Sequence, residues 1–90
     1  MSLPDITPIE FSDERPIYRQ IADQLRDLIE QGVLAPGEPI PTEAHMVEVY
    51  GTARGTIRQA RSLLEQEGLI KRRRGRGYFV VNRSESQQPG

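Results

Sequence analysis

Glycines at positions 32, 51 and 68 each follow a segment in which apolar residues recur at helical spacing. Glycine readily takes the left-handed backbone conformation that ends helices. We therefore expect three helices, at about residues 16–31, 43–50 and 52–67. The connector between the first two, VLAPGEPIP, holds three prolines and a glycine and cannot be helical. The second and third helices are separated only by a tight glycine-containing turn, which is typical of a helix-turn-helix.

A β-hairpin is predicted after the third helix. The strand-like segments LIKRR and GYFVV are joined by RGRG, with glycines where a tight turn requires a positive φ. The order of helix, helix, helix and hairpin predicts a mainly α fold with a small β-hairpin, a winged helix-turn-helix. We expect this domain to span residues 15–82. Residues 1–14 and 83–90 are rich in proline, serine, glutamine and acids, and we expect flexible tails there, the second being also a possible linker.

Charge is strongly segregated along the chain. Residues 1–50 carry ten acidic residues against three arginines, whereas residues 51–90 carry nine basic residues against three acidic ones. The net charge of −1 hides this difference, which predicts a face suited to an anionic partner.

With no cysteine there is neither a disulfide nor a thiolate metal site. No apolar run is long enough to cross a membrane and the N-terminus does not resemble a signal peptide, so we expect a cytoplasmic protein.

The third helix carries three arginines on one side. At about 100° per residue, Arg54, Arg58 and Arg61 fall within an arc of roughly 60°, and the apolar residues of this helix lie on a separate arc. A helix fits the major groove of DNA, where arginine forms two hydrogen bonds with guanine. We predict DNA contacts from this region at Thr52, Arg54, Gly55, Thr56, Arg58 and Arg61. The alternative is that these arginines only form surface ion pairs with Glu65 and Glu67.

The hairpin is the second predicted contact region. Its basic residues would neutralise phosphates or enter the minor groove beside the third helix, and its glycines would let the tip approach closely. Phe79 and Val81, or their neighbours, would anchor its base. The predicted contacts of this region are Arg72, Arg73, Arg74, Gly75, Arg76 and Gly77, together with Lys71.

A family resemblance rests on two long segments, PIYRQIADQLRDLIEQGVLAPGEPIPTE and GTARGTIRQARSLLEQEGLIKRRRGRGYFV. Over about residues 16–81 the chain resembles the N-terminal DNA-binding domain of GntR-family bacterial transcription regulators. The most specific motifs are the APGEPIPTE connector, the R-x-T-I-R-Q-A core of the third helix, and EQEGLI followed by an arginine-rich GRG-aromatic turn. The resemblance implies a homodimer on a short palindromic DNA operator, usually acting as a repressor. For the isolated domain, a monomer that binds weakly is the alternative. We expect no cofactor.

The resemblance also assigns roles to particular positions. Arg54, Thr56 and Arg58 occupy positions that read bases and contact phosphates in the family, and Gly75 or Gly77 corresponds to a wing-tip glycine that enters the minor groove in some relatives. The sequence departs from the family pattern at four positions. These are Ala44, where a DNA-contacting arginine is common, Ala53 in place of a capping Ser or Thr, Gly55 in place of a frequent Thr, and Arg61 in place of an apolar residue.

The departures lead to two further expectations. Thr52 would have to cap the third helix, and Arg61 would either contact phosphate or pack its stem against the core. Nothing in the sequence corresponds to the family's effector-binding and dimerisation domain, so we expect either a separate DNA-binding domain or a short regulator without a sensor.

Other classes of function have little support. His45 lies near scattered carboxylates that form neither a metal-ligand set nor a catalytic pair, and no serine or threonine has a base at a suitable spacing, so an enzyme is not expected. The remaining alternative is a winged helix that binds protein or RNA. RNA readers usually expose aromatic residues for stacking on bases, and the only candidates here are Tyr18 and Tyr78.

Overall fold

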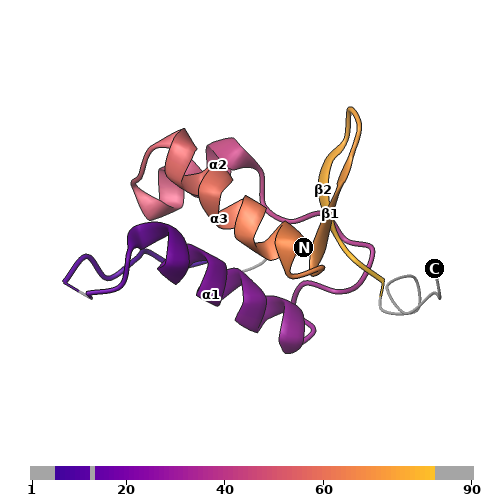
Figure 1. Cartoon of the computed structure of the whole chain (residues 1–90), viewed down its shortest axis with the longest axis horizontal. Coiled ribbons are helices and arrows are strands. Elements are labelled where there is room, and N and C mark those ends of the chain that lie inside the picture. Colours follow the sequence, from indigo (N-terminus) through magenta and orange to yellow (C-terminus); the bar gives the residue numbers. More distant parts are fainter. Residues whose placement is uncertain (1–5, 13, 83–90) are drawn as a thin grey trace.

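The computed structural model describes residues 6–12 and 14–82. Within them the chain forms three helices followed by a two-stranded hairpin (Figure 1). The elements are α1 (Ile17–Glu30), α2 (Glu43–Tyr50), α3 (Arg54–Gln66), β1 (Ile70–Arg73) and β2 (Gly77–Val80). This order confirms the predicted winged helix-turn-helix, with the hairpin as the wing. No helix in the described ranges is both long and apolar enough to cross a membrane.

The ends of the helices follow from local chemistry. Gly32, Gly51 and Gly68 all have positive φ, at 81°, 65° and 79°, as expected for residues that end helices. Thr42 caps α2, because its hydroxyl oxygen accepts a hydrogen bond of 3.1 Å from the backbone N–H of His45. The predicted capping of α3 by Thr52 is wrong. Ala53 occupies the cap position and has no side-chain acceptor, so no side chain caps the start of α3.

One apolar core holds the helices and the wing together. α3 lies along α1, and α2 crosses at the start of α3 (Figure 1). Tyr50 fills the space between the helices at 1% exposure, and its hydroxyl donates a 2.9 Å hydrogen bond to Gln24. Each fully buried side chain of this size contributes about 1.5–3 kcal/mol. The other large, fully buried side chains are Ile21, Leu25, Leu34, Met46, Ile57, Leu64 and Ile70.

The connector between α1 and α2 is part of the β-structure. Pro39 forms an antiparallel bridge with Phe79 of β2. The N–H of Ile40 donates to Tyr78 over 3.0 Å, and the N–H of Val80 donates to Glu38 over 2.8 Å. β2 therefore lies between the connector and β1, with which it pairs in register Ile70 with Val80 and Arg73 with Gly77. These bonds fix the base of the wing on both sides of β2.

Part of the predicted N-terminal tail contacts α1. Ile9 is buried at 8% exposure, and Gln24 exchanges hydrogen bonds with the backbone of Thr7 at 2.9 and 3.2 Å. The core thus includes a residue from upstream of the expected boundary at 15. The limits of the domain otherwise stay a prediction, because residues 1–5 and the predicted C-terminal tail at 83–90 lie outside the described residues.

Candidate nucleic-acid interface

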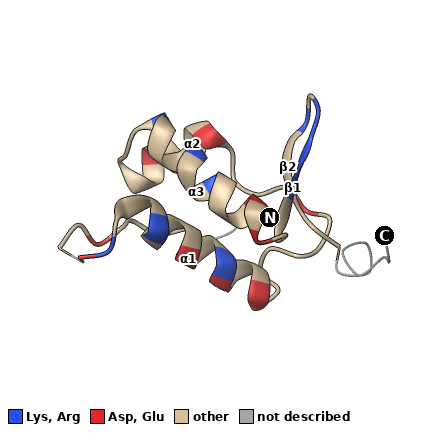
Figure 2. Cartoon of the chain, in the orientation of Figure 1, with Lys and Arg blue, Asp and Glu red and all other residues tan. Residues whose placement is uncertain are grey.

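The wing and α3 bring the basic half of the sequence together in space. Figure 2 shows basic residues along the length of the hairpin and on α3, while acidic residues alternate with basic ones along α1. The wing stands beside α3 and projects beyond the helices (Figure 1). The wing is therefore the region where positive charge is concentrated, whereas α1 carries both signs.

A single carboxylate gathers the three arginines of α3. Arg58 donates to Glu43 through Nε (2.8 Å to Oε2) and Nη2 (3.2 Å to Oε1). Arg54 donates through Nη1 to Oε1 at 2.7 Å, and Arg61 through Nη2 to Oε2 at 3.3 Å. Glu43 is the first residue of α2, so these contacts join α2 to the exposed face of α3.

The environment of Glu43 favours its charged form. Hydrogen bonds from Arg58 and Arg54 lower the pKa of this carboxyl from 4.5 to about 2, against a smaller opposing effect of burial. The side chain of Glu43 is 18% exposed, whereas those of Arg54 and Arg58 are 59% and 61% exposed. The carboxylate therefore lies beneath two guanidinium groups that remain open to solvent.

Arg61 differs from its two neighbours. Its side chain is only 16% exposed, and its guanidinium lies 4.2 Å from the centre of the Tyr78 ring on β2. Its Nε is buried and has no hydrogen-bond partner among the described residues. Of the two expectations for this residue, the structure favours packing against the core. Arg61 and Tyr78 border a pocket of about 310 Å³ between the start of α2, α3 and the wing.

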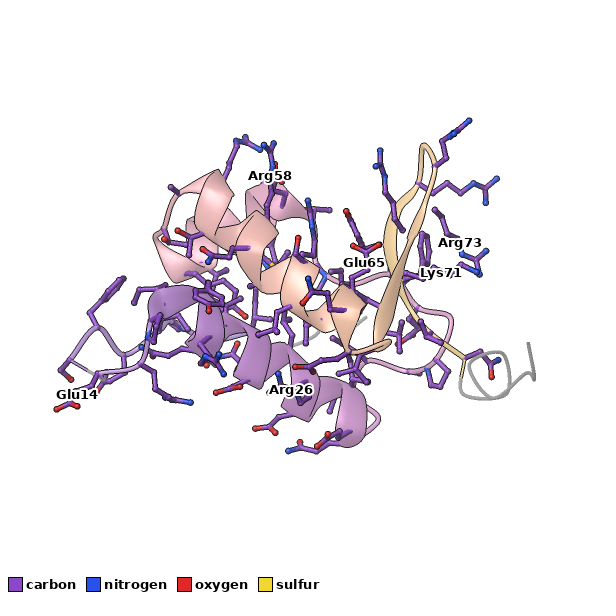
Figure 3. The ribbon with its side chains drawn as sticks, viewed as in Figure 1. Glu14, Arg26, Arg58, Glu65, Lys71 and Arg73 are labelled. Atoms are coloured by element: carbon purple, nitrogen blue, oxygen red, sulfur yellow. The ribbon has the colours of Figure 1, made fainter. Side chains whose placement is uncertain are left out.

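The wing presents its charges on strand β1 and on the narrow turn that follows it. Gly75 and Gly77 have φ of 75° and 96°, as predicted for the turn, and the N–H of Arg76 donates to Arg73 over 2.9 Å. Lys71 and Arg73 point away from α3 (Figure 3), and the guanidinium of Arg73 lies 5.3 Å from the centre of the Phe79 ring. The basic residues of the wing are all exposed, and none forms an ion pair within the described ranges. They are Lys71, Arg72, Arg73, Arg74 and Arg76.

The alternative ion pairs considered from the sequence are not formed. Glu67 accepts two 2.8 Å hydrogen bonds from Arg26 of α1 instead, and this pair joins α1 to the end of α3. Glu65 forms no ion pair with an arginine of α3, and it lies between α3 and the wing (Figure 3). Sequence reasoning missed Glu43 as the common partner. Its spacing of 11, 15 and 18 residues from the three arginines gives no local signal, because the contact depends on how α2 crosses α3.

The predicted contact residues fall into two groups. Arg54, Gly55 and Arg58 are exposed at the start of α3, with Thr52 and Thr56 half-buried beside them. The basic residues and glycines of the wing form the second group, and Arg61 lies between the two. Both groups and Arg61 therefore lie on neighbouring elements, α3 and the wing. Their contact with DNA stays a prediction.

A family model and the similar curated proteins agree on the kind of protein that this chain resembles. Residues 17–80 match the family model described as bacterial regulatory proteins, gntR family. The HTH-type transcriptional repressor NagR of Bacillus subtilis is 49% identical over 65 residues, which are 72% of this chain and 27% of NagR. The mannosyl-D-glycerate transport/metabolism system repressor MngR of Escherichia coli is 39% identical over 73% of this chain and 28% of MngR. The chain thus spans less than a third of the length of these relatives.

Solved structures add a comparison in three dimensions. The DNA-binding domain of AraR in complex with operator ORX1 superimposes with a TM-score of 0.72 at 36% identity. The match covers 74% of this chain and 81% of the AraR domain. The same arrangement of three helices and a wing therefore occurs in a domain that was solved bound to its operator.

Proposed function

This chain belongs to the gntR family of bacterial regulatory proteins, and from that premise we propose that it regulates transcription by sequence-specific binding to double-stranded DNA. The observation that carries the proposal is the pair of exposed guanidinium groups, Arg54 and Arg58, at the start of a helix that is open to solvent on that side. The structural likeness to an operator-bound domain supports it.

In the proposed complex α3 enters the major groove. Arg58 reads a guanine, and the uncapped N–H groups at the start of α3 receive a phosphate, since no side chain competes for them. The wing lies over the adjacent minor groove or its phosphates. A narrow minor groove attracts arginine through its enhanced negative potential, and five exposed basic residues are available there.

The assembly we propose is a homodimer on a palindromic operator. Two copies would place their α3 helices in successive major grooves about 34 Å apart, one helical turn of DNA. Binding would repress transcription by blocking the promoter. The protein would act in the cytoplasm, where the chromosome of a bacterium lies.

Selection from a randomised duplex pool, carried out with this chain at two salt concentrations, tests the proposal. We expect enrichment of a palindromic sequence. The double variant Arg54→Ala/Arg58→Ala should lose that enrichment, while Arg19→Ala, which removes an exposed arginine from α1, should keep it. Absence of binding even at low salt would reject the DNA-binding function and favour a winged helix that captures protein or RNA.

A further inference from the structure

The arginines that face DNA in the proposed complex already have an anionic partner in the protein. Glu43 accepts three hydrogen bonds from Arg54 and Arg58, at 2.7 to 3.2 Å, and a fourth from the more buried Arg61 at 3.3 Å. Phosphate would have to compete with this carboxylate for the same N–H groups. Such an arrangement lowers the affinity for DNA in general, so it requires an explanation.

The geometry at Arg58 supplies one. A guanidinium has five N–H donors, which form separate edges of a planar fork. Glu43 engages the edge made by Nε and Nη2, at 2.8 and 3.2 Å. The outer edge, formed by Nη1 and the second N–H of Nη2, has no described partner, and the side chain is 61% exposed. That outer edge is the kind that forms two hydrogen bonds with O6 and N7 of guanine.

The position of Glu43 at the start of α2 fixes its carboxylate in place beside Arg58. As the first residue of α2 it lies where the helix dipole stabilises a negative charge, and its backbone is held by the capped first turn. Its side chain is 18% exposed, beneath the two open arginines. Glu43 therefore orients Arg58 from behind, and it can remain bound while the outer edge of the guanidinium meets a base.

We propose that Glu43 is a specificity-determining positioning residue, which holds Arg54 and Arg58 for base contacts and disfavours their use on phosphates. A phosphate drawn towards these guanidinium groups meets the negative charge of the carboxylate, whereas the edge of a guanine carries no net charge. Glu43 thus reduces binding to arbitrary sequences more than binding to the operator. This inference rests on the DNA-binding function proposed above.

The test compares Glu43→Gln with Glu48→Gln. Both remove one negative charge from α2, but Glu48 is exposed and has no described ion pair. Affinities of the full chain are measured for the selected duplex, for the same duplex with the guanine opposite Arg58 replaced by adenine, and for a random duplex, over a salt series.

We expect Glu43→Gln to lower the ratio of operator to random-duplex affinity about tenfold, since one well-held arginine–guanine pair provides discrimination of that order. The preference for guanine over adenine should fall with it. On the random duplex, binding should tighten and the slope of log K against log salt should steepen by about one, because a released arginine gains a phosphate. Glu48→Gln should leave the ratio and the slope as in the wild type.

Two outcomes would overturn parts of the argument separately. If the wild type binds with specificity and Glu43→Gln behaves like Glu48→Gln, the role of Glu43 is wrong while the proposed function stands. If the wild type binds no duplex, the proposed function itself fails. Thermal unfolding of both variants, with binding measured well below their midpoints, ensures that a change in the ratio does not reflect unfolding. The Nε–H NMR signal of Arg58 provides a readout without DNA, and it should shift in Glu43→Gln only.

Discussion

The arginines of α3 and those of the wing differ in whether a carboxylate holds them. On α3, three guanidinium groups share one carboxylate and are held within hydrogen-bonding distance of it. On the wing, five basic residues surround a glycine turn, and none has a described ion pair. Reading a base requires a donor fixed in direction, whereas neutralising a phosphate requires only a nearby charge. The arginines of α3 are thus held in fixed directions, whereas the wing offers a high density of positive charge.

The largest effect should come from removing an oriented arginine. Arg58→Ala is expected to cost about 1–3 kcal/mol of binding free energy on the operator, which is the discrimination that one bidentate pair provides. Binding to a random duplex should change far less, because Arg58 is held by Glu43. Titration of both duplexes at one salt concentration measures the two losses. Equal losses would remove the distinction between α3 and the wing.

Glycines in the two regions should respond to alanine with opposite sign. Gly75 in the wing has a φ of 75°, where a Cβ costs about 1–2 kcal/mol, while Gly55 lies in α3, where alanine is favoured by up to about 1 kcal/mol. At neither position would the added Cβ meet another atom within 4 Å. Chemical denaturation should therefore show Gly75→Ala less stable and Gly55→Ala more stable than the wild type. Shifts in the same direction would contradict the backbone argument.

A charge on the wing should have a smaller and less selective effect. Arg74→Ala removes an exposed guanidinium without a described partner, so it should weaken operator and random duplexes alike. The salt slope should fall by about 0.9 if one phosphate contact is lost, so that the wild type loses about threefold more affinity than the variant between about 50 and 200 mM salt. A loss confined to the operator would mean that the wing reads sequence.

The smallest expected effect concerns stability in acid. The pKa of Glu43 is about 2 in the folded chain, below its ordinary value of 4.5, so its pairing with arginine stabilises the fold above about pH 4.5. That contribution is lost as the pH falls towards 2. The free energy of unfolding should therefore decline less steeply in Glu43→Gln than in Glu48→Gln over this range. Urea unfolding at several pH values gives the comparison, and parallel curves would show that the pairing is weak in solution.

Most of the fold was predictable because its signals are local. The spacing of residues such as Ile21 and Leu25 shows one buried face, and each helix ends at a glycine that takes positive φ as expected. The hairpin follows from Gly75 and Gly77 between two apolar–basic segments. The cap of α3 was missed at the same local level, since Ala53 rather than Thr52 occupies the cap position.

The candidate site was predictable only in its composition. The helical wheel places Arg61 with Arg54 and Arg58, yet only Arg61 packs under the wing, because Tyr78 approaches from an element 17 residues away. Glu43 and the pairing of Pro39 with Phe79 depend on tertiary contacts in the same way. Periodicity tells which side of a helix faces outward, but not which neighbouring element reaches it.

The pairing of the connector with β2 has a consequence for association between copies. An exposed strand edge invites the addition of another strand, and proteins discourage this with charge and short length. Here β2 lies between the connector and β1, so within the described residues β1 forms one outer edge of the small sheet. That strand is four residues long and three of them are Lys71, Arg72 and Arg73. If the β1 edges of two copies met, their basic side chains would repel one another. The charge of the wing therefore disfavours aggregation by pairing of β1 between copies.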